Sequence, residues 1–370
     1  MYLSGDRPYR WNWPNDFQTP FTNQGEGFAY SRSGTYLVGW CRLSDPQWGS
    51  PFIQTGAGAP TSLGTSVPIP PASYIFSGEA HGVSDNGQTA VGWFNYIFTA
   101  GGGGDQAFYW KQATGIAPLP DLAGGPVNCA AYDLSPDGRY AVGFVQGTLP
   151  TGNVQKQAAV WDLGATTIAP VRLSSASVSE SEARAISANG AFAVGYEKVQ
   201  NTSTAVRWPT SGGVPFEVPM GTGAYTAIAL GVSADGSVIV GQANLNAPSA
   251  LGFIWDAAHG MRRLDDVVAL QGAPLPCQIT SATSISDDGR TVAANGPCGA
   301  WVIRLGGACG SHDFDGDGDA ATDHDIEAFF ACIAGNCCAA CGTPDFNHDG
   351  DSSTDADIES FFRALAGQGC

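Results

Sequence analysis

One motif, repeated about every 50 residues, constrains the fold of this chain more than any other feature. Each copy contains an apolar or aromatic residue, a serine, one variable residue, a small polar residue and a glycine, in that order. The six glycines stand 53, 51, 52, 46 and 53 residues apart, at Gly34, Gly87, Gly138, Gly190, Gly236 and Gly289. A period of about 50 residues is typical of folds in which each repeat packs against the next.

Each repeat contains the pattern of a β-hairpin. Asn-Gly and Asp-Gly favour the primed turn types, so we expect positive φ angles at both central residues. A Val-Gly pair follows in five copies, from Val38-Gly39 to Val240-Gly241, and Ala293-Ala294 replaces it in the sixth. Glycine at the end of the second strand predicts a close backbone approach or a bulge.

A second half-motif with an aromatic residue predicts two further strands in most repeats. Its tryptophans are Trp110, Trp161, Trp208, Trp255 and Trp301. Four short strands per repeat are typical of a propeller blade, so six copies predict a mainly β fold, a six-bladed β-propeller over residues 1–305. We expect the aromatic residues to fill the blade cores. We expect the stretch with Trp11 and Trp13 to pair with residues 301–305 and close the ring, because an open ring leaves strand edges unpaired.

The repeated pattern is similar to that of a known family. Ala-x-x-Val-Ser-x-Asp-Gly, then Val-Gly, then Ala-Phe-x-Trp resembles the HAF repeats of extracellular β-propellers. The resemblance extends over residues 28–305. It implies a secreted propeller and no particular chemistry.

The propeller half contains no recognisable catalytic constellation, and no catalytic residue is predicted there. Its two histidines, His81 and His259, lie apart from cysteines and carboxylate clusters, and a structural role is favoured for His81. Glu180 and Glu182 are close in sequence, but their spacing alone does not define an acid–base pair.

Acidic residues are concentrated in residues 306–370. This tail holds 13 of the 34 acidic residues and a single basic residue, Arg363, which leaves 21 acidic and 15 basic residues in 1–305. Both parts are net negative, which argues against nucleic acid as a partner.

Six of the ten cysteines lie in the tail, at Cys309, Cys332, Cys337, Cys338, Cys341 and Cys370. Even counts in both parts favour disulfides in an oxidising compartment over a zinc site at the Cys-x-x-Cys pair. We expect a Cys277–Cys298 disulfide, a Cys309–Cys370 clasp and pairing among the other four tail cysteines. Cys41 and Cys129 are expected to be free.

The tail contains one acidic segment twice, as residues 313–325 and 345–357, at an offset of 32 residues. Calcium takes roughly six to eight oxygen ligands, which calcium-binding loops supply at alternate positions around a glycine at position 6. Gly318 and Gly350 occupy that position. The sequence predicts two Ca²⁺ ions, held by Asp313, Asp315, Asp317, Asp319 and Asp325, and by Asp345, Asn347, Asp349, Asp351 and Asp357.

The last ligand of each loop is predicted at position 13, in a loop one residue longer than usual. Position 12 is His324 or Ala356, and neither suits calcium. A helix should follow each loop, because apolar residues recur at helical spacing. These residues are Ile326, Phe329, Phe330 and Ile333, then Ile358, Phe361, Phe362 and Leu365. Gly335 and Gly367 should end the helices.

Two such loop–helix units resemble a type I dockerin, and the GC-type variant in particular, which ends in Gly-Cys as Gly369-Cys370 does here. The resemblance covers residues 309–370. It implies two calcium ions, a three-helix module and a cohesin-like partner. In dockerins, loop positions 10 and 11 help to select the partner, which implies that role for Thr322, Asp323, Thr354 and Asp355.

We therefore expect a secreted propeller, residues 1–305, anchored through a dockerin-like module, residues 306–370. The propeller would be a non-catalytic binding module for a glycan or a protein. The alternative is a carbohydrate-active enzyme, a glycoside hydrolase with its site in the propeller funnel, which a carboxylate pair at the funnel mouth would favour. Residues 1–15 show no signal peptide and no segment is long and apolar enough to span a membrane. We expect the true start upstream, or a mature or truncated chain.

Overall fold

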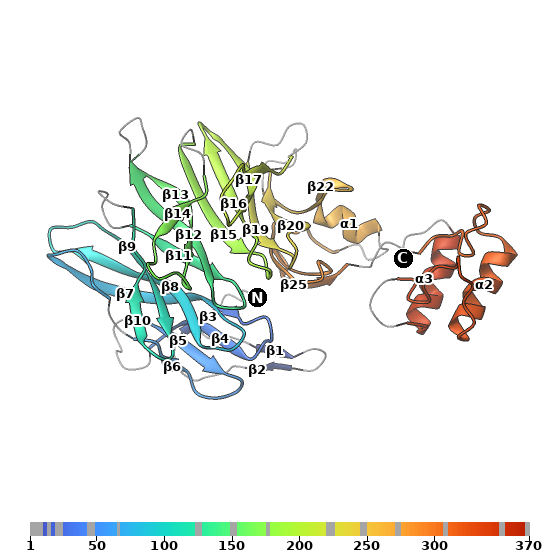
Figure 1. The fold of residues 1–370 in the computed structure, drawn as a ribbon, viewed down its shortest axis with the longest axis horizontal. Helices are drawn as coiled ribbons and strands as arrows, with labels where there is room; N and C mark the ends of the chain where they lie inside the picture. Colours follow the sequence, from blue (N-terminus) through green and yellow to red (C-terminus); the bar gives the residue numbers. More distant parts are fainter. Residues whose placement is uncertain are drawn as a thin grey trace.

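The computed structural model describes residues 10–12, 16–18, 25–42, 49–64, 67–122, 128–148, 154–174, 178–219, 226–244, 250–270, 275–305, 310–347 and 352–366. Sheets follow one another around an axis, from blue through green to brown in Figure 1, and the helices α2 and α3 belong to the tail.

Each repeat forms one antiparallel sheet, which confirms the predicted six-bladed β-propeller. The first two blades contain β3 (Gly25–Tyr30), β4 (Tyr36–Cys41), β5 (Ser50–Thr55) and β6 (Thr61–Ser62), then β7 (Ser73–Val83), β8 (Thr89–Phe98), β9 (Gly103–Lys111) and β10 (Gly115–Pro118). The third and fourth contain β11 (Ala130–Leu134), β12 (Tyr140–Thr148), β13 (Val154–Asp162) and β14 (Pro170–Arg172), then β15 (Glu180–Ile186), β16 (Phe192–Val199), β17 (Thr202–Pro209) and β18 (Phe216–Glu217). The fifth contains β19 (Ala227–Val232), β20 (Val238–Ala243), β21 (Leu251–Asp256) and β22 (Gly260–Arg263), and the sixth β23 (Ser281–Ile285), β24 (Thr291–Gly296) and β25 (Gly299–Arg304).

The predicted pairing of the N-terminal stretch with the last blade was wrong for the residues that are described. Strand β1 (Arg10–Asn12), which contains Trp11, pairs with β2 (Asp16–Gln18), and the sixth blade is a sheet of three strands. Trp13 lies outside the described residues. A local hairpin closes a far shorter loop than pairing with a strand at the other end of the repeats, so its entropic cost is lower.

The repeated turn is held by its serine, and it is not the primed turn that we expected. In the third blade, the Ser135 hydroxyl donates to Asp137 Oδ1 at 2.5 Å and accepts from the Tyr140 amide at 2.9 Å. Asp137 Oδ1 also accepts from the Arg139 amide at 2.9 Å. Gly138 has a φ of 76°, whereas Asp137 is not among the residues with positive φ. These side-chain bonds hold the Asp residue without a left-handed conformation.

A β-bulge interrupts the first strand of every blade at the same place. The register shifts fall between Gly27 and Ala29, Ala80 and Gly82, Ala131 and Asp133, Ala183 and Ala185, Ala229 and Gly231, and Ala282 and Ser284. The Val-Gly glycine of the second strand faces this bulge, so a Cβ at Gly143 would lie 1.9 Å from the Ala130 carbonyl oxygen. This confirms the predicted bulge and close approach.

Apolar clusters join each blade to the next, and the repeated tryptophans are part of them. Trp161 of the third blade is buried with Val91 and Ala107 of the second. Trp208 of the fourth blade is buried in the same way against Val142 of the third. These contacts confirm that the aromatic stripe fills the blade cores.

The disulfides agree with the sequence predictions where they are described. Cys277 pairs with Cys298, and the four inner tail cysteines pair as Cys332–Cys337 and Cys338–Cys341. Cys41 and Cys129 are free and buried, and burial raises the pKa of both thiols to about 12. Cys309 and Cys370 lie outside the described residues.

The tail contains α2 (Asp323–Ile333) and α3 (Asp355–Leu365), packed around four buried phenylalanines. These are Phe314, Phe329, Phe346 and Phe361. Residues 310–347 and 352–366 thus contain two helices, whereas the resemblance implied three. The only other described helix is α1 (Leu264–Leu270), and no described helix is long and apolar enough to cross a membrane.

We predict that Gly143→Ala destabilises the propeller by about 1–3 kcal/mol, because the new Cβ would force the bulge carbonyl away. Gly164→Ala is the matched control, since its Cβ would meet only flexible side chains, Asp162 at 3.2 Å and Arg139 at 3.7 Å. Urea unfolding followed by tryptophan fluorescence measures both. Equal midpoints for the two variants would show that the close approach does not constrain the blade.

Candidate functional site

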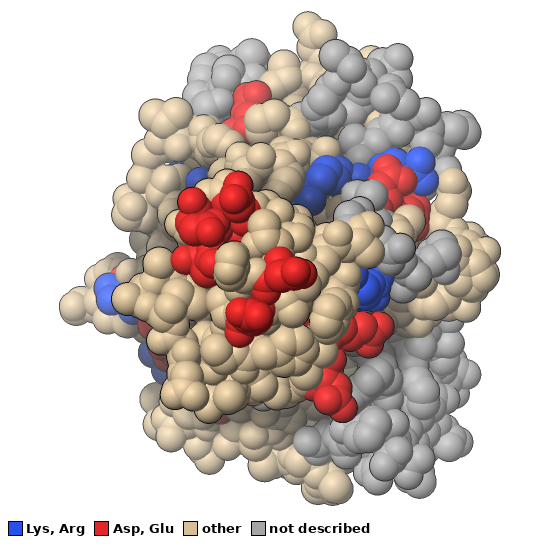
Figure 2. Space-filling view, turned by 90° about the vertical axis from the view of Figure 1, so that its right-hand side faces the viewer, with Lys and Arg blue, Asp and Glu red and all other residues tan. Residues whose placement is uncertain are grey.

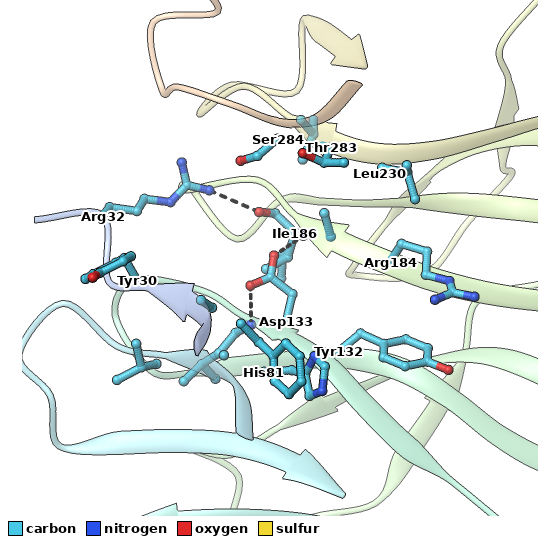
Figure 3. Close-up of a pocket in the computed structure, with 18 of the residues that line it drawn as sticks. Tyr30, Arg32, His81, Tyr132, Asp133, Arg184, Ile186, Leu230, Thr283 and Ser284 are labelled. Atoms are coloured by element: carbon cyan, nitrogen blue, oxygen red, sulfur yellow. Dashed lines mark hydrogen bonds between the residues drawn. The ribbon is translucent and has the colours of Figure 1, made fainter. Parts of the chain in front are cut away.

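The six blades enclose one cavity of about 1080 Å³ along the propeller axis. Residues of the first strand of every blade, β3, β7, β11, β15, β19 and β23, line it. Figure 3 shows these strands running past the cavity, with Arg32 at one end and Arg184 toward the other.

The residue at each bulge lines this cavity, so the bulges form a ring of six side chains. This bulge ring consists of Phe28, His81, Tyr132, Arg184, Leu230 and Thr283. A bulge is known to re-aim a side chain beside functional sites. Sequence reasoning missed the ring, although each member stands three residues before the repeated serine and varies within an otherwise constant motif.

The ring residues of blades one to four are connected by aromatic contacts. The His81 ring is stacked between Phe28, at 4.3 Å, and Trp93, at 3.9 Å. Trp93 contacts Tyr132 edge-on at 5.4 Å, and the Arg184 guanidinium lies over the Tyr132 ring at 4.6 Å. His81 therefore has the structural role that we predicted, and it also forms part of the cavity wall.

Charged groups near the ring have partners within the wall. Glu182, which is only 2% exposed, forms ion pairs with Lys156 at 2.7 Å and with Arg184. Glu79 contacts His81 Nε2 at 3.0 Å. Burial lowers the pKa of His81, so the imidazole is neutral at neutral pH and its bond to Glu79 is a hydrogen bond.

Arg32 spans the end of the cavity at which the turns meet. It extends from the first blade, forms an ion pair with Asp287 of the sixth and donates to the Ile186 carbonyl of the fourth at 3.2 Å. Asp133 accepts from the amides of Ile186 at 2.9 Å and Leu134 at 2.8 Å, and burial raises its pKa to about 6. These contacts join the first, third, fourth and sixth blades around Arg32.

The first acidic loop of the tail brings together three of its predicted calcium ligands. Ligand oxygens of Asp313, Asp315 and Asp317 lie within 4.8 Å of one another. Asp313 Oδ1 is buried without a hydrogen-bond partner, while its Oδ2 accepts from the Gly318 amide at 3.1 Å. A buried carboxylate oxygen among other carboxylates fits a hard cation. Asp319 is exposed, and its amide donates to Asp317 Oδ1 at 2.8 Å.

The structure places Asp325 differently, as the cap of α2. Its Oδ1 accepts from the amides of Phe314 at 2.7 Å and Asp315 at 3.3 Å, and its Oδ2 accepts from the Thr322 amide at 2.8 Å and hydroxyl at 3.0 Å. Burial acts to raise the pKa of Asp325, but these bonds outweigh it and the pKa is lowered. Asp325 is therefore ionised and outside the group of three, and a ligand role for it stays a prediction.

The second loop repeats this arrangement as far as it is described. Asp357 Oδ2 accepts from the Thr354 amide and hydroxyl, both at 2.8 Å, and its Oδ1 from the Asn347 amide at 3.4 Å. Asp345 lies at the start of this loop, while Asp349 and Asp351 lie outside the described residues. The two loops are also joined by equivalent backbone bonds, from Gly310 to Phe346 and from Gly342 to Phe314, both 2.9 Å.

Of the predicted partner-selecting residues, Thr322 and Thr354 are half-buried N-caps, whereas Asp323 and Asp355 are exposed at the helix starts. Two apolar residues near them are also exposed, Phe330 by 41% and Phe362 by 45%. Their rings lie 6.1 Å apart. Both phenylalanines belong to the apolar stripes that mark the two helices in the sequence, but they lie outside the buried core of the tail. Figure 2, which views the molecule from the side of the tail, shows clusters of acidic side chains there.

No family model and no curated protein matches this chain. Among solved structures, it is similar to one from a study of two prolyl endopeptidases, with a TM-score of 0.50, 12% identity, and coverage of 75% of this chain and 40% of that one. TolB from Acinetobacter baumannii (TM-score 0.41, 12% identity, 65% of this chain and 54% of that one) and a TolB-type protein from Agrobacterium tumefaciens (0.45, 13%, 78% and 94%) are more distant. The chain thus spans less than half of the first match, and the likeness shows the propeller fold alone.

We predict that Arg32→Met destabilises the chain by about 1–3 kcal/mol, because Asp287 and the Ile186 carbonyl each lose a charged donor. Arg139→Met is the matched control. It breaks the exposed Arg139–Asp162 pair, 3.0 Å long, and should leave the urea midpoint almost unchanged, because water screens an exposed pair. Urea unfolding compares the two, and equal losses would show that Arg32 does not hold the ring.

Proposed function

We propose that this protein is a secreted, non-catalytic binding module whose tail binds two calcium ions and docks to a cohesin-like partner. The tail would be a dockerin-like domain of residues 306–370, and the propeller, with its HAF-like repeats, a domain of residues 1–305 that binds a ligand. The observation behind the docking role is the buried, unpartnered Asp313 Oδ1 beside Asp315 and Asp317.

Calcium would be held in the first loop by Asp313, Asp315 and Asp317, with Asp319 beside them. The equivalent residues of the second loop are Asp345, Asn347, Asp349 and Asp351. A bound divalent cation offsets the repulsion between carboxylates that the loop holds close together. The caps at Asp325 and Asp357 support the proposal, because they fix the start of each helix next to the loop.

The docking face would include the exposed pair Phe330 and Phe362 with Asp323 and Asp355. The members of each pair are 32 residues apart in the sequence, so the two units present equivalent groups. Neighbouring exposed aromatic residues favour a protein partner, because large apolar side chains are costly to leave in water.

Binding rather than hydrolysis is supported by the partners of the carboxylates that line the cavity. Asp287 is paired with Arg32, Asp133 accepts from two amides, Glu79 contacts His81, and Asp288 accepts from Ser286 and the Arg290 amide. A glycosidase needs two carboxyl groups that face a shared substrate position. Polysaccharides incubated with the full chain should therefore be retained and not shortened, which affinity electrophoresis and reducing-end assays measure.

We predict that the tail requires calcium to fold. Each like-charged pair about 4 Å apart costs about 4 kcal/mol at an effective dielectric near 20, and helices of this length are marginal alone. A chelator added to reduced residues 306–370 should abolish their helical circular dichroism, and Asp313→Ala with Asp345→Ala should do the same in calcium. Helicity that persists in chelator would contradict a calcium-dependent fold.

We also predict that Phe330→Ala with Phe362→Ala abolishes docking while calcium binding and tail helicity stay intact, because both side chains lie outside the core. Calorimetry against a panel of recombinant cohesin domains, in calcium, measures the loss. Val214→Ala, at an 87% exposed position of the propeller, is the control. Docking that survives the double substitution would place the partner on another face.

A further inference from the structure

We propose that the bulge ring is a carbohydrate-binding site, which takes the end of an uncharged polysaccharide chain into the axial cavity. The proposal rests on the binding role proposed for the propeller and adds the site and the ligand class.

The bulges make side chains, rather than strand edges, the recognition elements of the cavity. Each first strand is paired on one side only, so its other edge is open to an added strand. The bulge breaks each of these edges in its middle, which prevents a continuous ladder with an extended peptide. Side chains at the six bulges project into the cavity instead, as Figure 3 shows for His81, Tyr132, Arg184, Leu230 and Thr283.

The ring is asymmetric, which is expected of a site that orients its ligand. Blades one to four supply an aromatic and polar wall, from Phe28 to Arg184, whose members fix one another by stacking. Blades five and six supply Leu230 and Thr283, which are smaller and leave room beside them. Rigid aromatic rings opposite hydroxyl and aliphatic groups suit a sugar, which has apolar faces and polar edges.

The charges of the wall indicate an uncharged ligand. Glu182 pairs with both Arg184 and Lys156, and Asp287 pairs with Arg32, so each guanidinium of the wall already has a carboxylate partner. His81 covers one face of Trp93 and Arg184 covers one face of Tyr132, so neither of these two faces is open to a ligand cation. The hydroxyl groups of Tyr132 and Ser284 can exchange hydrogen bonds with a polyol, and the Thr283 hydroxyl, which donates to the Ala293 carbonyl at 3.2 Å, can still accept one.

The cavity can take only the end of a chain, because contacts between the blades span the end of the cavity at which the repeated turns meet. Backbone bonds link neighbouring turns around the axis, from Asp85 to Pro136 at 2.8 Å and from Ala234 to Asp287 at 3.0 Å. Arg32 crosses the same end. A polymer cannot thread through, so it enters from the opposite mouth and stops.

The test fills the cavity without disturbing the core. Leu230→Trp and, separately, Thr283→Trp are made in the full chain, and Val214→Trp is the matched control on the outer surface. Calorimetry and tryptophan fluorescence are run in calcium with four neutral hexaoses (cello-, xylo-, manno- and malto-), hexagalacturonate, a chitosan hexamer and an unstructured hexapeptide. Thermal unfolding checks that each variant folds.

We expect at least one neutral hexaose to bind, each cavity variant to weaken that binding at least tenfold, and Val214→Trp to leave it unchanged. Affinity counted per chain end should be the same for the hexaose and its polymer. Preference for the uronate, the chitosan or the peptide, unchanged binding by both cavity variants, or no binding of any neutral hexaose would each overturn the proposal. Docking and calcium binding of the same variants are measured separately, so that a negative result for sugar binding does not count against the docking role. Asp313→Ala with Asp345→Ala should leave sugar binding intact.

Discussion

In five of the six blades, a glycine in the second strand lies close to a carbonyl oxygen of the first strand just before the bulge, whereas the sixth blade has Ala294 at that position. At Gly39, Gly92, Gly143 and Gly195, a Cβ would lie 1.9 Å from that oxygen. The bulge lets one extra residue leave the ladder, and in every blade that residue lines the axial cavity. The glycine contact thus accompanies the bulge in five blades, and the bulges of all six blades supply the six side chains that surround the cavity.

The interface that closes the ring, between the sixth blade and the first, differs from the other five. Among the described residues, shared apolar clusters join blades one to two through five to six. At the position of the repeated tryptophan, the first blade has a buried glutamine, Gln54, paired with Leu37 across the strands. Arg32, bound to Asp287 and Ile186, supplies a contact across this interface. The cation that closes the ring is therefore also the one that ends the cavity.

The sequence predicts the blades well, because every copy has the same pattern. In it, glycine marks the turn or the close approach, serine precedes the turn and tryptophan fills the core. It does not predict the turn type, since Asp-Gly favours a primed turn and only the serine hydroxyl, bonded across the turn, overrides that preference. The bulge ring was hidden for the opposite reason. Phe28, His81 and Arg184 differ in chemical type, and only the register of the folded strands places them at the same level along the propeller axis.

In the tail, the same carboxylate pattern serves two purposes that the sequence alone does not separate. Alternate spacing correctly brings Asp313, Asp315 and Asp317 together, but Asp325 uses both oxygens to hold Thr322 and the amides of residues 314 and 315. Because Asp325 caps the helix and also accepts hydrogen bonds from the loop backbone, the start of the helix and the conformation of the loop depend on each other. Any cation that orders the three carboxylates would also order the residues that Asp325 holds, so metal binding and helix formation would be coupled through that one side chain.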